Sequence, residues 1–501
     1  MSDGGPAGAE DRRFAEIQAR LRPLADDGWP GEPERTVVVC PSLDVDPDML
    51  ARHEQTLDAY EQRSLYLLFM LKRPGIRIVM LSSHAIPEPI LDYYLGLVPA
   101  PGNETARERL TLISAERGGT SPLAEKMLDD PALIERIRSA AGGPEDAFIA
   151  PYMVRRSERD LALAVGLPVY CPDHRFERFG TKVGSRQLFR EAGVALPRGR
   201  EEIGTREQLR DAIAGLRAEP DPPEALVVKH NDAVYGEGNA ILRLDDLPAP
   251  GSAAEPAALA ELVDSLGDEY LEKLASDPGI VEELVPGEIT SPSAQVRTIA
   301  DGEAGLVSTH DQILGGEHGQ TFTGASFPAD PAYGPEIAAE AERLRARMAE
   351  LGVVGRFGVD FVCARRGDGW ECVAIEINLR EGGTTHPFGA LYFLTDARYD
   401  PSTGVCTTPE GDRKHYVASD LLVDERLIGS TATEVIDAVE AAGLGWDAGT
   451  GRGAVLHMLG ALELEGKCGA TVIADSAEQA AADYGRLQGA LSDLAEARAR
   501  R

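Results

Sequence analysis

The first 175 residues alternate short apolar segments with helical ones, and this alternation limits the possible folds more than any other feature. It predicts strands at 36–40 and 76–81, shorter apolar runs at 147–150 and 168–171, and a long helical pattern at 49–71. Such alternation is typical of a parallel sheet covered by helices. The first strand runs into PSLDVD rather than a Gly-x-Gly-x-x-Gly turn. We therefore expect a Rossmann-like α/β domain at 36–175 without a dinucleotide site.

The pattern changes after about residue 175. A helix is predicted at 182–192, and strands are predicted at 225–229, 279–284, 295–300, 359–364 and 371–377. The last two strands flank RRGDG, whose Asp-Gly pair is typical of a hairpin turn. Helical patterns, an apolar segment at 453–462 and a charged helix at 476–501 follow. We divide the chain into an extension at 1–35, the Rossmann-like domain, an α+β domain at 176–400 and a small C-terminal α/β domain at 405–501.

The charge balance excludes some classes of partner. Lys and Arg number 50 against 83 Asp and Glu, which gives a net charge of −33. Nucleic acids and anionic membranes are polyanions, so neither is an expected partner, whereas a nucleotide needs only a local cationic pocket. We see no apolar run of about 18 residues and no secretory signal pattern, so we expect a cytoplasmic protein. The six cysteines are scattered without a Cys-x-x-Cys pair, and we expect reduced thiols rather than disulfides or a zinc site.

Three oxygen-bearing side chains fall on the predicted hairpin. Asp360 lies on its first strand, and Glu376 and Asn378, two residues apart on the second, point to one face. Two carboxylates and an amide oxygen suit Mg²⁺ that is also held by phosphates. The alternative is an ordinary solvated hairpin face. Apolar neighbours such as Val359 and Ile377 make the strands central, where unpaired carboxylates are costly, so we favour the metal site.

A lysine and a glycine-bearing loop precede the hairpin. Lys229 ends an apolar strand, and the loop at 231–239 contains Tyr235, Gly236 and Gly238. A lysine at a strand end can contact phosphate, and glycines let backbone N–H groups approach it. Taken alone, the pattern also fits a surface charge and a simple turn.

A further segment could bind a nucleoside. It contains Glu282, Glu283, Val285 and Glu288. Its backbone could pair with a purine edge while Glu288 accepts hydrogen bonds from ribose hydroxyls. In isolation the same segment also fits a strand that leaves the core.

Taken in order, these segments resemble the ATP-grasp ligases. That superfamily has a lysine on a helix, Lys182 in FGTKVGSRQLF here, followed by the strand-end lysine, the glycine loop, the nucleoside segment and the metal strands. The order of all these pieces is far more specific than any one of them. The resemblance implies ATP and Mg²⁺ as cofactors. It also implies a two-lobed ATP-grasp domain at 176–400, with a mobile lid lobe at about 195–285, after a pre-ATP-grasp domain.

A closer resemblance covers nearly the whole chain. SPSAQVRTIADGEAGLVSTHDQILGG and GAVLHMLGALELEGKCGATVIADS are similar to the ATP-grasp peptide ligases of pheganomycin-type biosynthesis. That family implies the ligation of a small carboxylic acid to the amine of an amino acid or peptide. The expected route is an acyl phosphate with release of ADP, in the biosynthesis of a peptide natural product such as an antibiotic. The Arg380-Glu381 pair combines features of several ATP-grasp subfamilies, so the identity of the acid substrate stays open.

The implied reaction assigns further roles. Arg297 and Arg380 are expected to clamp the carboxylate and the acyl phosphate, because a planar guanidinium binds carboxylate bidentately. Backbone N–H groups near Gly383 and Thr384 could complete an oxyanion site. His310 and His386 could line the acceptor site or act as the base for the amine, although a structural histidine is commoner.

Other functions remain open from the sequence. A biotin-carboxylase-like enzyme shares the Glu-x-Asn-x-Arg pattern but would need a separate carrier. A non-catalytic ATP-binding protein would have lost a lysine or a metal ligand, and none is lost here. A kinase would stop at the phosphorylated acid. The sequence also leaves a homo-oligomer open.

Overall fold

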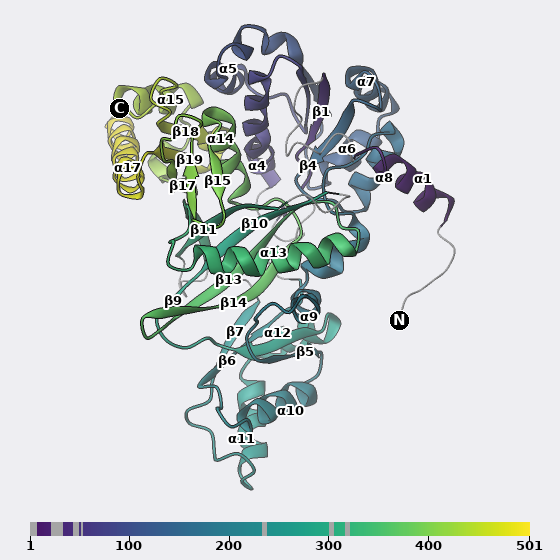
Figure 1. Cartoon of the computed structure of the whole chain (residues 1–501), viewed down its shortest axis with the longest axis vertical. Helices are drawn as coiled ribbons and strands as arrows, with labels where there is room; N and C mark the ends of the chain where they lie inside the picture. Colours follow the sequence, from purple (N-terminus) through teal and green to yellow (C-terminus); the bar gives the residue numbers. More distant parts are fainter. Residues whose placement is uncertain are drawn as a thin grey trace.

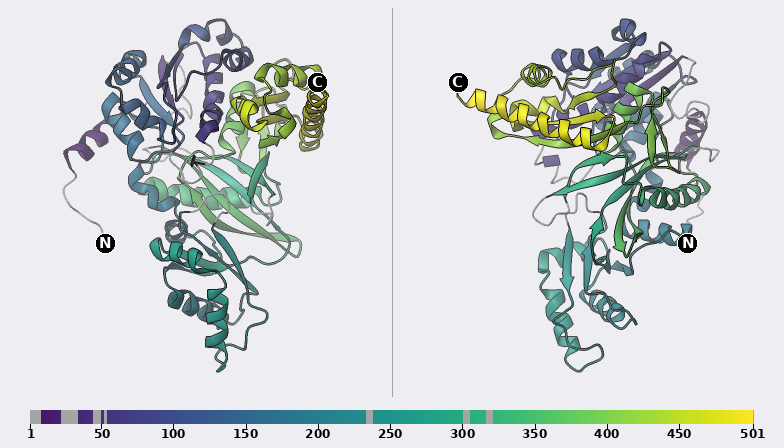
Figure 2. Two further views of the ribbon diagram at one scale, coloured as in Figure 1. Left: turned by 180° about the vertical axis from the view of Figure 1, so that it is seen from behind. Right: turned by 60° about the vertical axis from the view of Figure 1, so that its left-hand side comes forward.

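The computed structural model describes residues 8–21, 34–43, 50–51, 54–232, 238–299, 305–315 and 321–500. A parallel sheet lies at the top of Figure 1, a large antiparallel sheet crosses the middle, and a small lobe projects below. Figure 2 shows the same lobe standing away from the rest of the molecule in two further views. The mixed α/β class expected from the sequence is confirmed.

The N-terminal sheet is parallel and has the strand order β3-β2-β1-β4. Its strands are β1 (Arg35–Cys40), β2 (Ile76–Ser82), β3 (Leu110–Ser114) and β4 (Ala147–Pro151). The helices around it are α1 (Ala9–Gln18), α4 (Leu57–Glu61), α5 (Glu88–Leu97), α6 (Leu123–Leu128), α7 (Pro131–Ala141) and α8 (Arg156–Val165). The central strand β1 is wholly apolar and buried from Val37 to Cys40, as expected for a strand covered on both faces.

The structure of this domain differs from the sequence expectations in three places. Strand β3 was not predicted, because its residues are half exposed and only Ile113 is buried. The apolar run at 168–171 makes only an isolated bridge, from Val169 to Ile149. The predicted long helix at 49–71 is instead the short α4, followed by a 3₁₀ helix, η2 (Gln62–Lys72). In η2 every residue from Gln62 to Leu71 is buried, so tertiary packing rather than amphipathic periodicity determines it.

The small lobe follows α9 (Lys182–Ala192) and carries an antiparallel sheet of order β5-β8-β6-β7. Its elements are β5 (Gly199–Ile203), α10 (Arg206–Arg217), β6 (Ala225–Lys229), β7 (Asn239–Arg243), α11 (Glu255–Asp264), α12 (Asp268–Ser276) and β8 (Gly279–Glu283). Helix α10 begins with a capping box in which Thr205 and Gln208 bond each other's backbone N–H groups. One apolar cluster, including Leu216, Val228 and Val281, fills the lobe.

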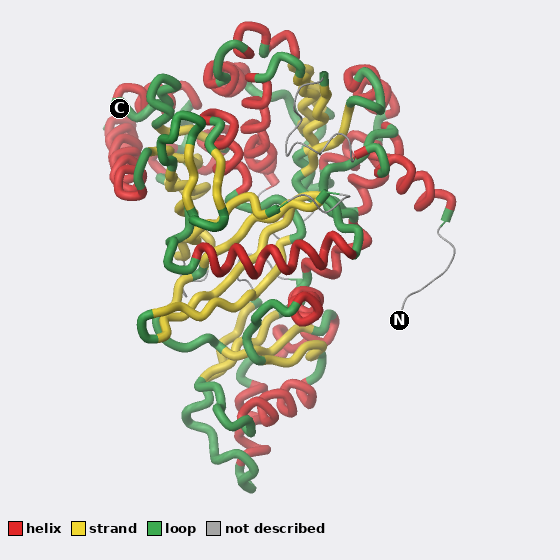
Figure 3. The backbone as a smooth tube through the Cα atoms, viewed as in Figure 1, coloured by secondary structure: helices red, strands yellow, loops and turns green. Residues whose placement is uncertain are grey.

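The large sheet is antiparallel and, among the described residues, has the order β14-β13-β10-β11-β12-β17-β19-β18, with β9 beside β13. Figure 3 shows its strands in yellow, crossing the middle of the molecule. Its strands are β9 (Ile289–Thr290), β10 (Pro292–Thr298), β11 (Leu306–Gly315), β12 (Thr321–Phe327), β13 (Gly355–Arg366), β14 (Gly369–Asn378), β17 (His415–Val423), β18 (Gly453–His457) and β19 (Lys467–Ala474). The remaining elements are α13 (Gly334–Glu350), α14 (Thr385–Thr395), β15 (Arg398–Asp400), β16 (Val405–Thr407), α15 (Ala432–Ala441), α16 (Leu462–Glu465) and α17 (Ala477–Ala499). The sheet thus continues across the boundary that the sequence suggested at residue 405.

The cysteine expectation is corrected by the hairpin β13–β14. Cys363 and Cys372 form a disulfide, with Cα atoms 4.0 Å apart. Pairing outward from the Asp-Gly turn places these two residues directly opposite each other. The remaining four, Cys40, Cys171, Cys406 and Cys468, are buried free thiols.

In the described part of the chain, we find no helix that combines the length and apolarity needed to cross a bilayer. The expected cytoplasmic location stays a prediction.

Candidate active site

A cavity of about 610 Å³ lies where the parts of the molecule meet. The N-terminal domain contributes Arg63 and Tyr152, and the lobe with its entry helix contributes Lys182 and Lys229. The large sheet adds residues of β13 and β14, and the C-terminal strands add Asp420 and Lys467. The predicted site residues that line the cavity are Lys182, Lys229, Glu282, Glu283, Val285, Asp360, Glu376, Asn378, Arg380, Gly383 and Thr384.

The predicted metal ligands form one acidic face of the cavity. Asp360 on β13 pairs with Glu376 on β14. The Asn378 amide donates to Asp360 Oδ2 at 2.8 Å, and the Gln312 amide donates to Asp360 Oδ1 at 2.7 Å. Burial, and then the charge of Glu376, raise the pKa of Asp360 to about 6. A bound cation would stabilise the charged forms of these two neighbouring carboxylates. The oxygen donors therefore fit Mg²⁺.

Both predicted phosphate-binding lysines lie on the cavity wall against carboxylates. Lys182 Nζ lies 2.5 Å from Glu376 Oε1, and Lys229 Nζ lies 2.6 Å from Glu282 Oε1. Glu282 also binds Arg186. Lys182 is the first residue of α9, which Thr181 caps by accepting a hydrogen bond from the Gly184 N–H. The two cations are therefore fixed in a buried site that an anionic phosphate could enter.

A further part of the cavity lining is cationic and aromatic. We call Arg63, Arg356, Arg380 and Lys467 the cationic wall; all four side chains line the cavity. Arg380 Nη1 donates to the Tyr152 hydroxyl at 3.3 Å, and the Arg63 guanidinium lies 5.2 Å from the centre of the same ring. Lys467 Nζ lies 2.9 Å from the Tyr60 hydroxyl. Guanidinium groups held in this way can bind a carboxylate bidentately.

A glycine loop joins the metal strand to helix α14. The Gln295 amide donates to Thr384 Oγ1 at 2.8 Å, which fixes the end of the loop. A Cβ atom on Gly383 would lie 2.6 Å from Phe322 Cε1, so a side chain there fits only if the Phe322 ring moves. The loop thus lets backbone approach the cavity closely.

Five predicted residues do not line the cavity in the described part of the chain: Gly238, Glu288, Arg297, His310 and His386. Glu288 is exposed and bonds through its carbonyl to the Arg365 N–H at 2.9 Å. Arg297 lies on β10 next to β13, opposite Arg356. Gly238 has a φ of 80° and its carbonyl accepts from Tyr270 at 2.8 Å, whereas Tyr235 and Gly236 lie outside the described residues.

The expectation that His310 lines an acceptor site is corrected by its packing. The residue is fully buried, with its ring 5.3 Å from Phe327 and 5.9 Å from Tyr416. Burial lowers the pKa of His310 to about 3, so the ring is neutral. His386 is also buried, and its pKa is lowered to about 4, chiefly by burial, but it adjoins the cavity residue Asp420.

Sequence reasoning missed several cavity residues. Arg356 could have been found, since it shares a strand face with Gly358 and Asp360 by the period of two. Arg63, Asp420 and Lys467 carry no local signal, because they reach the cavity from elements far apart in the sequence.

Comparisons with known proteins agree with this geometry. Residues 180–384 match the ATP-grasp domain, and residues 434–487 match the PGM1 C-terminal domain. The chain is 33% identical over 438 residues to L-propargylglycine–L-glutamate ligase of Streptantibioticus cattleyicolor, covering 86% of this chain and 88% of that protein. Among solved structures, an ADP complex of N5-carboxyaminoimidazole ribonucleotide synthetase has a TM-score of 0.52 at 16% identity, covering 93% of this chain and 98% of that one. Biotin carboxylase from Campylobacter jejuni has a TM-score of 0.51 at 13% identity, covering 89% of both chains.

Proposed function

Since the chain belongs to the ATP-grasp ligase family, we propose that it joins a carboxylic acid to the amine of an amino acid or peptide through an acyl phosphate. One observation carries the proposal. A single cavity is lined by two lysines, by the acidic metal face and by the cationic wall. The lysines and the acidic face suit ATP with Mg²⁺, the cofactors of ATP-grasp ligases, and the cationic wall suits carboxylate substrates.

In the first step, a carboxylate oxygen of the acid attacks the γ-phosphorus of ATP. The bond between that phosphorus and the bridging oxygen breaks, and ADP leaves. Lys182 and Lys229 would exchange their carboxylate partners for phosphate oxygens, so the charge is balanced inside a buried site. Asp360, Glu376 and Asn378 would hold Mg²⁺, which supplies positive charge to the phosphates.

In the second step, the amine attacks the carbonyl carbon of the acyl phosphate. The attacking nitrogen gives up a proton, the tetrahedral oxyanion collapses, the bond from carbon to the phosphate oxygen breaks, and inorganic phosphate leaves with that proton as the amide forms. Arg380 and the backbone near Gly383 and Thr384 would stabilise the negative charge, which is usually the largest single contribution to such a reaction. Phe322, packed over Gly383, would keep bulk water from the intermediate.

The proposed substrate class rests on two observations, the similar ligase of Streptantibioticus cattleyicolor and the cationic wall. The relative is named for a ligase of L-propargylglycine and L-glutamate, two amino acids, one with an extra carboxylate. The four side chains of the cationic wall line the cavity here. We propose an α-amino acid as the acyl donor and an anionic amino acid or peptide as the acceptor.

The test is nucleotide release by the purified full-length chain. Mg-ATP is mixed with pooled amino acids as donors and with L-glutamate and short acidic peptides as acceptors, and ADP and AMP are resolved by chromatography. We expect ADP in proportion to a condensed product mass, and only when donor and acceptor are both present. ADP without an amide would contradict ligation, and AMP would contradict the acyl phosphate.

A further inference from the structure

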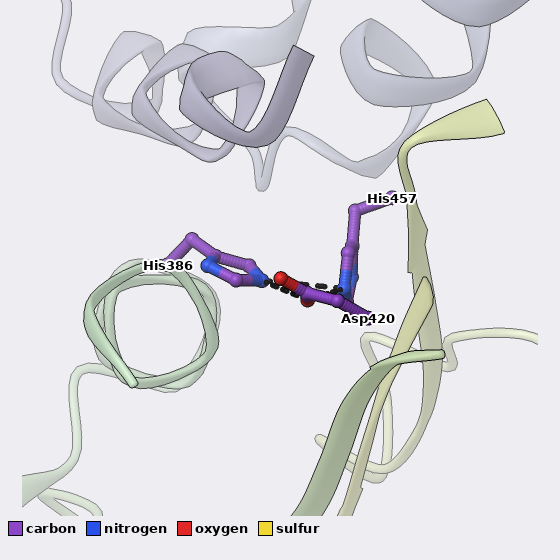
Figure 4. A group of neighbouring side chains, drawn as sticks. All are labelled: His386, Asp420 and His457. Atoms are coloured by element: carbon purple, nitrogen blue, oxygen red, sulfur yellow. Dashed lines mark hydrogen bonds and ion pairs between the residues drawn. The ribbon is translucent and has the colours of Figure 1, made fainter. Parts of the chain in front are cut away.

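Three metal-binding side chains converge beside the cavity, from elements far apart in the sequence (Figure 4). His386 projects from the first turn of α14, Asp420 from β17 and His457 from the end of β18. The two Nε2 atoms lie 3.2 Å apart. Asp420 Oδ1 lies 3.2 Å from His386 Nε2 and 2.8 Å from His457 Nε2.

Hydrogen bonds alone leave a close contact in this triangle. If both imidazoles are neutral and donate to Asp420 Oδ1, the oxygen can accept both, but the two N–H nitrogens then lie 3.2 Å from each other. If one imidazole donates to the other, the accepting ring turns a lone pair toward the carboxylate. A cation bound by all three atoms removes the close contact in either case. Ligand atoms about 2.0–2.1 Å from a tetrahedral Zn²⁺ lie about 3.3 Å apart, so a shift of a few tenths of an ångström would complete the site.

The surroundings hold two of the three ligands, Asp420 and His457, in place. Arg63 Nη1 lies 3.3 Å from Asp420 Oδ2, so the second carboxylate oxygen is fixed and Oδ1 stays directed at the histidines. A Cβ atom on Gly469 of β19 would lie 2.1 Å from His457 Nε2, so this position leaves room for the ring only as glycine. Asp420 lies in a register shift between Ser419 and Leu422, which turns its side chain out of the β17–β19 pairing.

We propose that His386, Asp420 and His457 form a binding site for a zinc-type divalent transition metal, separate from the Mg²⁺ site and outside the ligase function proposed above. Two imidazoles and one carboxylate are a ligand set for such metals, whereas Mg²⁺ prefers oxygen donors alone. The ion would tie α14, which follows the loop carrying Gly383, to the C-terminal strands. Because Asp420 lines the cavity, a fourth coordination position can face it.

The site is tested on the purified full-length chain without any assay of ligation. The protein is stripped with a chelator, dialysed against Zn²⁺ in the presence of excess Mg²⁺, and its metal content is measured by mass spectrometry. We expect one tightly bound Zn²⁺ per chain. Co²⁺ in its place should give the intense visible absorption of a four- or five-coordinate ion with nitrogen ligands, not the pale spectrum of octahedral Co²⁺ on oxygens.

Variants assign the metal to this cluster. His457→Gln and Asp420→Asn should lower Zn²⁺ affinity by more than about a hundredfold, since loss of an outer-shell partner alone costs about 10–100-fold. Gly469→Ala should lower it about tenfold by displacing the His457 ring. Glu376→Gln should keep the Zn²⁺ because it alters only the Mg²⁺ site. His84→Gln is the matched control, because His84 lies in an exposed pair with Asp58 at 2.7 Å.

Zn²⁺ should also raise the unfolding temperature of the unsubstituted chain and of His84→Gln, and leave that of His457→Gln unchanged. Measurements on the unsubstituted chain are sufficient to contradict the proposal. Failure to retain Zn²⁺ or an octahedral Co²⁺ spectrum would contradict it, whatever the folding of the variants. Equal Zn²⁺ affinity in the unsubstituted chain and in His457→Gln would contradict it as well.

Discussion

Two groups of cavity residues are built in different ways. In the nucleotide group, Asp360, Glu376 and Asn378 come from one hairpin, and the two lysines from a helix start and a strand end. In the junction group, Arg63, Asp420 and Lys467 come from the N-terminal domain and the C-terminal strands. The first group is organised by local backbone geometry, the second by packing between domains. The comparison suggests that ATP handling and substrate selection can be changed separately.

The largest effect is expected at the metal face. Glu376→Ala removes a carboxylate ligand and the partner of Lys182 at 2.5 Å. We expect loss of about 4 kcal/mol of transition-state stabilisation, or about a thousandfold in kcat, with the fold retained. Steady-state kinetics and circular dichroism measure the two quantities. Glu371→Ala, on the same strand but exposed and paired with Arg366, should be neutral; turnover retained in Glu376→Ala would remove the metal assignment.

The next largest effect is expected on the cationic wall. Arg380→Gln keeps a polar side chain, although a shorter one, and removes the charge beside Tyr152. We expect kcat/KM for the acid to fall about a hundredfold, because hydrogen bonds to charged groups are worth about 1.5–3 kcal/mol. The Kd for Mg-ATP should not change. The control is Arg366→Gln, which changes an exposed arginine on β13. Weakened ATP binding in Arg380→Gln would contradict the separation of ATP binding from binding of the acid.

Lys229→Ala should affect only the binding of ATP. Glu282 keeps Arg186 as a partner, so the buried carboxylate is not left unpaired. We expect ATP binding to weaken about thirtyfold, from the loss of one charge-assisted hydrogen bond to phosphate. Calorimetry with Mg²⁺ present measures the affinity, and the exposed Lys273→Ala on the same lobe is the matched control. An unchanged ATP affinity would show that Lys229 serves only its pair with Glu282.

The smallest effect is expected at the glycine loop between the metal strand and α14. Gly383→Ala brings a Cβ atom 2.6 Å from Phe322 Cε1, and we expect about a tenfold loss in kcat as the loop or the ring shifts. Adding Phe322→Leu should make room and restore part of the rate, which a double-mutant cycle quantifies. Equal rates for Gly383→Ala and the unsubstituted chain would mean that the close approach has no role in turnover.

The sequence predicted what depends on short-range order. The hairpin with Asp360, Glu376 and Asn378, helix α9 and strand β6 were found at or near their true bounds because each follows from a period, a cap or a turn signal. The ligase class and the cofactors ATP and Mg²⁺, implied by resemblance, are confirmed at the level of the family.

What depends on long-range packing could not be read in the same way. The buried 3₁₀ helix that carries Arg63 has no helical periodicity to reveal it. The cluster of His386, Asp420 and His457 forms only when β17 and β18 join the large sheet beside α14. The disulfide is an intermediate case, because counting outward from the Asp-Gly turn places Cys363 opposite Cys372.

The most direct measurement of the central claim follows one oxygen atom. The donor acid is labelled with ¹⁸O in its carboxylate and incubated with Mg-ATP, the acceptor amine and the purified chain, and the products are analysed by mass spectrometry. Attack of the carboxylate on the γ-phosphorus, and later cleavage of the carbon–oxygen bond, predict one ¹⁸O atom in each inorganic phosphate released with the amide. Label in AMP, or amide formation with unlabelled phosphate, would contradict the acyl-phosphate route.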